Sequence, residues 1–308
     1  MQYAHAILGL LAHTSIHAGT GSHTGNIIDL PIQREGHNNW PCIFGSAIKG
    51  AIRTRAEDSL NLPELEEKPN PSIKLIFGAE ANEIDTHAGA VAFSDARLLL
   101  FPVRSLTSQF KWVTCPAALR RYQKDKARLG QEIDFKIPTH LLTKQDRALI
   151  PNGQQANTLF LEEYRFKEKP ANLVKIIEEM VTLMQGDDAE LTLLLRKQLV
   201  IVSDDMFSYI VQHATPVNAH IRIESETKMV TQGALWYEET LPPETLLYVT
   251  LSGVKARSTE NLDVTQTAQK MLEGVLDLFP PKKEWLQVGG NETVGMGWCA
   301  ISVNKIEK

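Results

Sequence analysis

The sequence predicts an α+β fold whose core follows the ferredoxin-like order of strand, helix, strand, strand, helix, strand. Two observations support this prediction. Apolar runs typical of buried strands occupy 3–14, 89–101 and 246–254, and a further strand region lies within 285–303. One helical pattern begins at Ser46 and another covers 262–279, so each of the two helices falls between two strands. RNA-recognition domains share this order, which makes RNA a candidate ligand.

Composition limits where such a ligand would bind. The chain has 308 residues, 43% of them hydrophobic, and a formal net charge of −5. This content is adequate for a packed core, but a net negative charge does not favour indiscriminate nucleic-acid binding. The N-terminal segment lacks the basic flank of a signal peptide, and no apolar run approaches the ~20 residues that span a bilayer. We therefore expect a cytoplasmic protein with no membrane partner and a local RNA-binding patch.

The N-terminal third of the chain concentrates polar residues around glycines. The first strand, 3–14, leads into a glycine-rich loop from Gly19 to Gly25. Ser46 is predicted to cap the following helix, in which Lys49 and Arg53 are four residues apart and share one face. A lysine near a helix start favours a phosphate contact, since the free N–H groups there attract anions. The proline-rich acidic stretch 62–71 is expected to be a loop or insertion.

Helical patterns dominate the middle of the chain. They cover 117–129, ended by Gly130, then 171–184, and then 188–200 behind the cap candidates Asp187 and Asp188. Alternation over 219–231 predicts a hairpin that turns at 224–228. The region 285–303 is expected to form two strand segments around the glycine-rich stretch 289–297. The strand at 89–101 is expected to end at Pro102.

Several candidate site residues leave two interpretations open. Asp29 follows two isoleucines and precedes Leu30-Pro31, where a carboxylate either caps a turn or takes part in chemistry. Five of the nine histidines lie in the first forty residues, but their spacing matches no metal-ligand motif. Residues 101–130 form a basic segment that is either a solvated helix face or an RNA contact. Its basic members are Arg104, Lys111, Arg120, Arg121, Lys124, Lys126 and Arg128.

The three cysteines indicate neither a disulfide framework nor a zinc site. Cys42, Cys115 and Cys299 are far apart and show no C-x-x-C spacing. We expect them to be reduced and structural.

Six blocks in order along the chain resemble the backbone subunit of type III-B CRISPR–Cas effector complexes, a RAMP-superfamily protein of the Cmr module. The most specific block is Ile28-Asp-Leu-Pro-Ile-Gln-Arg-Glu35. The others are Thr14-Ser-Ile-His17-Ala-Gly, Pro41 to Arg53, Val202-Ser-Asp-Asp-Met-Phe207, Gly233 to Pro242, and Gly289-Gly-Asn-Glu-Thr-Val-Gly-Met-Gly-Trp298. The chain departs from the family pattern in two ways: Ser15-Ile16 replaces Pro-Leu, and Asn26 is an extra residue before Asp29.

The resemblance implies an architecture and partners. An RNA-recognition-like palm is expected from 1–60, 88–103 and 241–308, with the insertion at 61–87, a helical lid at 104–204 and a thumb hairpin at 205–240. Copies of the subunit would stack as a helical backbone along a guide CRISPR RNA, beside other Cmr subunits. A target single-stranded RNA would pair with the guide, and the thumb would displace a nucleotide of that duplex at each repeat.

The resemblance also assigns roles to residues. Asp29 matches the cleavage residue of the family and His17 a nearby loop histidine. Because a free aspartate is a weak base at neutral pH, we expect Asp29 to hold a divalent cation, Mg²⁺ or Mn²⁺, and His17 to be the candidate for proton transfer. The expected activity is metal-dependent cleavage of target RNA in the assembled complex. The expected RNA-binding residues are Ser46, Lys49, Arg53, Gly289, Gly290, Gly295 and Gly297, together with Arg120 and Arg121, which come from the basic segment and not from a family block.

Two other functions remain open at this point. In the first, the chain is a structural RNA-binding subunit, Asp29 only orders its loop, and another protein cuts the target. In the second, the chain is a stand-alone processing endoribonuclease of the same superfamily that uses a histidine as general base. Mutation of Asp29 tests the first, and incubation of the isolated chain with precursor RNA tests the second.

Overall fold

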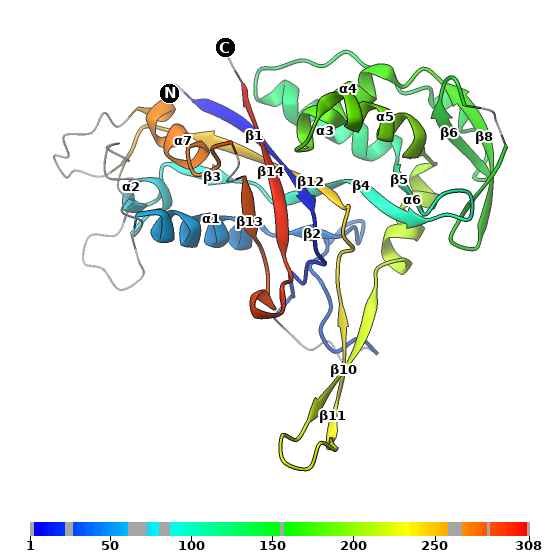
Figure 1. Cartoon of the computed structure of the whole chain (residues 1–308). Coiled ribbons are helices and arrows are strands. Elements are labelled where there is room, and N and C mark those ends of the chain that lie inside the picture. The colour runs from blue at the N-terminus through cyan, green and yellow to red at the C-terminus, as the bar shows by residue number, and fades with distance from the viewer. Residues whose placement is uncertain are drawn as a thin grey trace.

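A large mixed sheet, helices on both of its faces and a projecting hairpin make up the fold (Figure 1). The computed structural model describes residues 3–21, 27–60, 73–79, 87–154, 157–257, 267–281 and 284–306. The predicted α+β class is confirmed. The strands are β1 (Ala4–Ala12), β2 (Cys42–Ile43), β3 (Val91–Phe93), β4 (Ala96–Arg104), β5 (Phe110–Thr114), β6 (Arg147–Pro151), β7 (Thr158–Leu161), β8 (Tyr164–Ala171), β9 (Leu199–Ile201), β10 (Val217–Ile223), β11 (Val230–Glu239), β12 (Leu246–Gly253), β13 (Trp285–Gln287) and β14 (Trp298–Ile306). The helices are α1 (Gly45–Leu60), α2 (Ile73–Phe77), α3 (Pro116–Arg128), α4 (Val174–Leu183), α5 (Asp188–Gln198), α6 (Asp204–His213) and α7 (Ala268–Leu276), with 3₁₀ turns η2 (Thr139–Leu141) and η3 (Glu292–Val294).

Strands distant in sequence lie next to one another in the sheet. Its order is β13-β14-β1-β12-β4-β5-β9-β6-β8-β7, with β2 added to β4 and β3 to β12. The pairs from β13 to β5 are antiparallel, whereas β5 with β9 and β6 with β8 are parallel. In the register of the centre, Leu8 of β1 lies between Val249 of β12 and Val303 of β14. The two ends of the chain are thus neighbours in the sheet.

The first strand is apolar on both sides because helices cover both faces of the sheet. Leu8 and Leu10 belong to the core beneath α1 and α7, whereas Ile7 and Leu11 belong to the core beneath α3 and α4. Successive side chains of a strand point to opposite faces, so a strand buried on both shows a continuous apolar run. Gly9 is required where α4 ends, since a Cβ there would lie 2.0 Å from the Leu183 carbonyl oxygen.

The segment between β4 and α6 contains the three expected helices and also strands that were not predicted. Helices α3, α4 and α5 match the predicted ranges within a few residues, and Asp187 caps α5 by accepting from Ala189 and Glu190 N–H. Strands β5 to β9 extend the sheet through this segment. Their partners are distant, as in the pairing of Val113 with Val200, so local patterning carries little information about them.

Strand β4 does not end at Pro102, which corrects the prediction. Pro102 pairs with Trp112 of β5, and the strand continues to Arg104. Past Leu100, the pairing with β12 has ended and β4 has β5 as its neighbour. A proline is tolerated at such an edge because one side of the strand needs no N–H donor.

The start of α1 also differs from the prediction. The helix begins at Gly45, so Ser46 lies in its first turn and is not its N-cap. The Gly45 N–H donates to the Asp95 carboxylate at 2.7 Å, so a side chain from the β3–β4 turn supplies the anion at this helix end. Three of the predictions fall wholly or partly outside the described residues. They concern the acidic stretch 62–71, the extra residue Asn26, and the first part, 262–266, of the predicted last helix.

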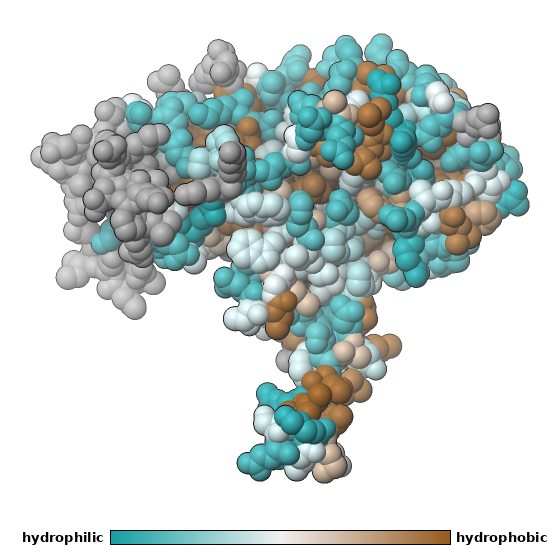
Figure 2. Space-filling view, in the orientation of Figure 1, coloured by the Kyte–Doolittle hydropathy of each residue, from teal (hydrophilic) through white to brown (hydrophobic). Residues whose placement is uncertain are grey.

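Strands β10 and β11 form the predicted hairpin, which projects from the rest of the molecule (Figure 1). One face of the hairpin is apolar and exposed, and Figure 2 shows hydrophobic side chains gathered on it. Its members include Val217, Ile221, Ile223, Val230 and Leu235, each 43–56% exposed. The base of β11 is different, because Glu238 and Glu239 are buried there. Among the described residues, no helix is long and apolar enough to cross a membrane.

Candidate functional site

Asp29 lies at the base of the hairpin. Its Oδ2 accepts a hydrogen bond from the backbone N–H of Tyr237 on β11 at 2.8 Å. The adjacent Leu30 exchanges two backbone hydrogen bonds with the same strand, donating to Tyr237 and accepting from Glu239, both at 3.0 Å. The carboxylate therefore does cap a backbone N–H, but of a distant strand and not of a local turn. This contact places Asp29 where the hairpin meets the sheet.

His17 contacts the same end of β11. Its Nδ1 lies 2.8 Å from the backbone carbonyl oxygen of Glu239, and its side chain is 12% exposed. A carbonyl oxygen only accepts, so Nδ1 carries the proton and Nε2 holds the lone pair of the neutral ring. Nε2 faces Gly19, where a Cβ would lie 2.8 Å from it. His17 and Asp29 thus contact residues of β11 that are two positions apart.

The glycine-rich stretch 289–297 packs against His17. Gly290 N–H donates to the His17 carbonyl oxygen at 2.9 Å. Gly289 has φ +88°, and a Cβ there would lie 2.4 Å from that same oxygen, so only glycine fits this approach. Asn291 donates to the Glu238 carboxylate at 2.6 Å, and Glu238 Oε1 lies 3.9 Å from His17 Nδ1. The loop predicted to contact RNA is therefore part of the same site as His17.

Glu239 holds this site together from the inside. Its side chain is 4% exposed, and its Oε1 accepts from Arg34 at 2.5 Å and from the Thr215 hydroxyl at 2.6 Å. Its Oε2 accepts from the backbone N–H of Ile32 at 3.1 Å. A buried carboxylate persists when donors and a cation compensate it.

Sequence reasoning missed the roles of Arg34, Glu238 and Glu239. All three lie in blocks that the family resemblance uses, but a charged residue in a block carries no sign of its burial. The signal that could have found the glutamates is two adjacent carboxylates at the end of an apolar strand. Such residues need nearby partners if they are buried.

The predicted guide contacts on α1 lie apart from this network. Ser46 is exposed, and Lys49 is partly buried, with a side chain that makes no hydrogen bond or ion pair within the described part of the chain. Arg53 pairs with Glu57 at 2.8 Å and donates to the Gly78 carbonyl oxygen at 3.4 Å. Gly295 has φ +82° and open space around it, and Gly297 packs against the Val288 carbonyl oxygen. Their contact with RNA stays a prediction.

Much of the basic segment 101–130 is engaged within the protein. Lys111 and Lys126 are buried, which corrects the interpretation of them as solvated charges. Lys111 donates to the Lys197 carbonyl oxygen at 2.7 Å, and Lys126 pairs with Glu179 at 3.0 Å. Strands and helices that are far apart in sequence supply these partners, so charge counting could not reveal them.

Arg120 and Arg121, both predicted to contact RNA, pair with acidic residues on other elements. Arg120 pairs with Asp204 at 3.1 Å and remains half-exposed. Arg121 donates to both carboxylate oxygens of Glu35, at 2.6 and 2.8 Å, and is 20% exposed. An RNA contact by Arg121 would compete with this ion pair.

The three cysteines are buried free thiols, as predicted. Burial raises the pKa of Cys42 and of Cys299 to about 12, and it also raises the pKa of Cys115. At neutral pH these thiols are therefore protonated and poor nucleophiles.

Within the described residues, three or more His, Cys, Asp or Glu side chains nowhere gather as a metal site. A cation at Asp29 would therefore have at most two such side chains of the described residues as ligands. That donor set fits Mg²⁺, which commonly keeps several waters and binds through one or two carboxylates and phosphate oxygens.

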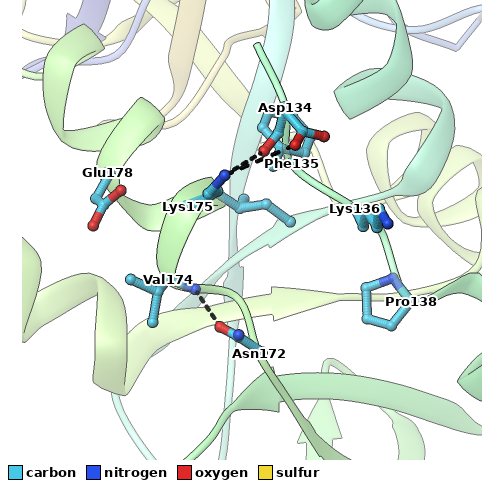
Figure 3. Close-up of a pocket in the computed structure, with 9 residues that line it drawn as sticks. Asp134, Phe135, Lys136, Pro138, Asn172, Val174, Lys175 and Glu178 are labelled. Carbon is cyan, nitrogen blue, oxygen red and sulfur yellow. Dashed lines mark hydrogen bonds and ion pairs between the residues drawn. The ribbon is translucent and has the colours of Figure 1, made fainter.

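Two cavities of the protein lie away from Asp29 and His17. One, of about 680 Å³, lies between the segment 134–138 and the start of α4, where Lys175 contacts Asp134 (Figure 3). The other, of about 470 Å³, lies beside the hairpin base and is lined by Tyr164, Tyr209 and His213 among others. Neither is lined by Asp29 or His17.

Comparison with known proteins identifies the family. The family model of the RAMP superfamily matches residues 10–300. The CRISPR system Cmr endoribonuclease Cmr4 of Pyrococcus furiosus is 32% identical over 304 residues, which cover 97% of this chain and 96% of that protein. The chain therefore belongs to the RAMP superfamily and, within it, to the family of Cmr4 subunits.

Solved structures agree with this assignment. The crystal structure of oligomeric Cmr4 from Pyrococcus furiosus matches with a TM-score of 0.71 and 28% identity, covering 99% of both chains. A chain of the type III-B Cmr-beta complex bound to cognate target RNA matches with a TM-score of 0.68, over 98% of this chain and 97% of that one. At 20% identity, the second match shows a shared fold.

Proposed function

We propose that this chain is the guide-RNA-binding backbone subunit of a type III-B CRISPR effector complex and that it cleaves complementary target RNA at regular intervals. The observation that carries the proposal is that Asp29 and His17 both contact the last residues of β11, where the hairpin leaves the sheet. The Cmr4 endoribonuclease that this chain resembles at 32% identity supports the same activity. Antiviral defence in the cytoplasm is the corresponding biological role.

The division into palm, lid and thumb is part of the proposal. The order β14-β1-β12-β4 corresponds to fourth, first, third and second strands of a ferredoxin-like core, with α1 and α7 as its two helices. This order supports an RNA-recognition-like palm, with 104–204 as the lid and 205–240 as the thumb. The apolar exposed face of the hairpin suits a thumb that inserts between bases. The oligomeric crystal form of the Pyrococcus protein supports stacking of copies.

The chemistry follows from what each side chain can supply. Displacement of a nucleotide frees its sugar, so the 2′-hydroxyl can align with the scissile phosphate. Asp29 would hold Mg²⁺ or Mn²⁺, and the bound cation would stabilise negative charge at that phosphate. His17 is oriented by its Nδ1 hydrogen bond to the Glu239 carbonyl oxygen, and its Nε2 is the nitrogen that can accept a proton.

Removal of divalent cations tests the proposal directly. The complex, reconstituted with its guide RNA and the other Cmr subunits, is expected to cut a complementary RNA at regular spacing in Mg²⁺. With EDTA, cleavage should stop while the target stays bound, and Mn²⁺ should restore it. The isolated chain is incubated in parallel with precursor RNA. Cutting of that precursor by the chain alone would favour the function of a processing endonuclease. Unchanged cleavage in EDTA would contradict the proposed requirement for a divalent cation.

Loss of Lys49 tests the proposed guide contact on α1. Lys49→Ala should weaken guide binding and lower the slope of log affinity against log salt by about 1, because one phosphate neutralisation is lost. Filter binding across a salt titration measures both. Lys270→Ala, which removes a lysine of α7 paired with Glu273, is the matched control and should change neither. Equal slopes for wild type and Lys49→Ala would remove Lys49 from the guide-binding surface.

A further inference from the structure

The segment 29–35 that carries Asp29 is held from two sides. It is extended, since Leu30, Ile32 and Arg34 each form an isolated β-bridge with a distant or neighbouring segment. In extended backbone, consecutive side chains point in opposite directions. Arg34 and Glu35, five and six residues after Asp29, therefore reach toward different parts of the molecule.

Arg34 reaches the base of the hairpin. Its guanidinium donates to Glu239 at 2.5 Å, to the Thr215 hydroxyl at 3.2 Å and to the Val211 carbonyl oxygen of α6 at 3.1 Å. A further bond, of 2.9 Å, goes to the Asn39 carbonyl oxygen. This side of the segment is thereby tied to α6 and β11.

Glu35 reaches α3 in the proposed lid. Both of its carboxylate oxygens accept from Arg121, which also donates to the Leu98 carbonyl oxygen at 3.2 Å and lies 5.2 Å above the Trp40 ring. The Glu35 side chain is 10% exposed. Both bonds come from one guanidinium nitrogen, Nη1, and the pair is largely buried, so the Arg121 guanidinium fixes the Glu35 carboxylate more firmly than an exposed ion pair would.

We infer that Arg121 is a positioning residue for Asp29: through Glu35, helix α3 holds the segment 29–35 against the base of β11. The inference rests on the proposed function for the role of Asp29, but the contacts are independent of it. It assigns Arg121 to the cleavage site in place of the RNA contact expected from charge. The orientation of the lid is then coupled to the position of the carboxylate that serves the scissile phosphate.

Helix α3 should stay in place without Arg121. Buried Asp125 on the same helix accepts from Arg97 and from the Tyr248 hydroxyl, each at 2.7 Å. Leu119 and Tyr122 of α3 are fully buried in the core beneath the sheet. A substitution of Arg121 therefore tests the segment 29–35 and not the attachment of the lid.

The first test measures cleavage in the assembled complex under single-turnover conditions. Arg121→Met should slow cleavage about 10- to 100-fold, since a small displacement of a positioned group is enough for such a loss. Guide content and target affinity should be unchanged. Arg121→Lys should be intermediate, and the exchange Glu35→Arg with Arg121→Glu should recover part of the rate. Lys124→Met, which removes an exposed charge from the same helix, should behave as wild type.

The second test does not depend on cleavage. Hydrogen exchange should accelerate at the amides of Leu30 and Tyr237 in Arg121→Met but not in Lys124→Met, because these amides pair β11 with the Asp29 segment. Unchanged exchange there, or a wild-type cleavage rate, would overturn the inference. So would a loss of guide binding that matches the loss of cleavage and is not recovered by the exchanged pair. A wild-type complex that does not cut would instead count against the proposed function, and the exchange rates would still decide the role of Arg121.

Discussion

Asp29→Asn should reduce cleavage of a bound complementary RNA by at least about 100-fold while the complex still assembles and binds its target. Asparagine has the same shape, and its carbonyl oxygen can still accept from the Tyr237 N–H that Asp29 now binds at 2.8 Å. The segment should therefore keep its place on β11. What is lost is the negative charge that would hold a divalent cation. Single-turnover cleavage of labelled RNA, with guide content and target affinity measured in parallel, separates the two effects.

The matched control is Asp95→Asn. Asp95 is an exposed carboxylate that accepts from the Gly45 N–H at the start of α1, so the substitution makes the same chemical change beside a predicted RNA-binding helix. It should leave the cleavage rate unchanged. If Asp29→Asn also cleaves at the wild-type rate, the carboxylate only orders its segment. The chain would then be a structural subunit, and another protein would cut the target.

Glu239→Gln should destabilise the folded chain by about 3 kcal/mol, because it leaves the guanidinium of Arg34 without its buried counter-ion. The side chain is 4% exposed and accepts from Arg34, Thr215 and the Ile32 N–H. A glutamine amide has one acceptor oxygen, and its NH₂ group would face a donor that the second carboxylate oxygen of Glu239 now accepts from. Urea unfolding followed by circular dichroism measures the change in the free energy of unfolding.

Glu238→Gln is the control for that substitution. Glu238 is its neighbour on β11 and is as deeply buried, but its hydrogen bond comes from the neutral amide of Asn291. A glutamine oxygen can accept the same bond, so the cost should be about 1 kcal/mol. Similar losses for the two variants would show that burial of any carboxylate here, and not the pairing with Arg34, stabilises the hairpin base.

Much of the fold could be predicted because its strongest patterns are local. The apolar run of 3–14 indicated a buried strand, which the structure has at 4–12, and Gly130 and Asp187 marked helix ends that the structure confirms. Strands β5 to β9 were not predicted, since a strand as short as Leu199–Ile201 exists by pairing with Thr114 and its neighbours, some 85 residues away. Pro102 in β4 was misjudged for the same reason. A strand tolerates a proline where one of its sides has no partner, and only the tertiary structure shows that the pairing of β4 with β12 ends at Leu100.

The site divides along similar lines. The motif around Asp29, the loop histidine His17 and the glycine-rich stretch 289–297 stand out by residue type, and these positions come together at the hairpin base. Charge alone misassigned Lys111 and Lys126, which are buried, and could not show that Arg121 pairs with Glu35. The charge of a side chain can be read from the sequence, but its counter-ion lies on another element and is known only from the structure.

By itself, then, the sequence determined the α+β class, the family blocks and the identity of the polar residues that could carry chemistry. Only the tertiary structure decided which of them meet. Asp29 is bound by a strand some 200 residues further on, and Arg34 and Glu35 separate toward the hairpin and the lid. The physical reason is that hydrogen bonds and ion pairs act over a few ångströms, whereas the chain brings their partners together only when the sheet between them has formed.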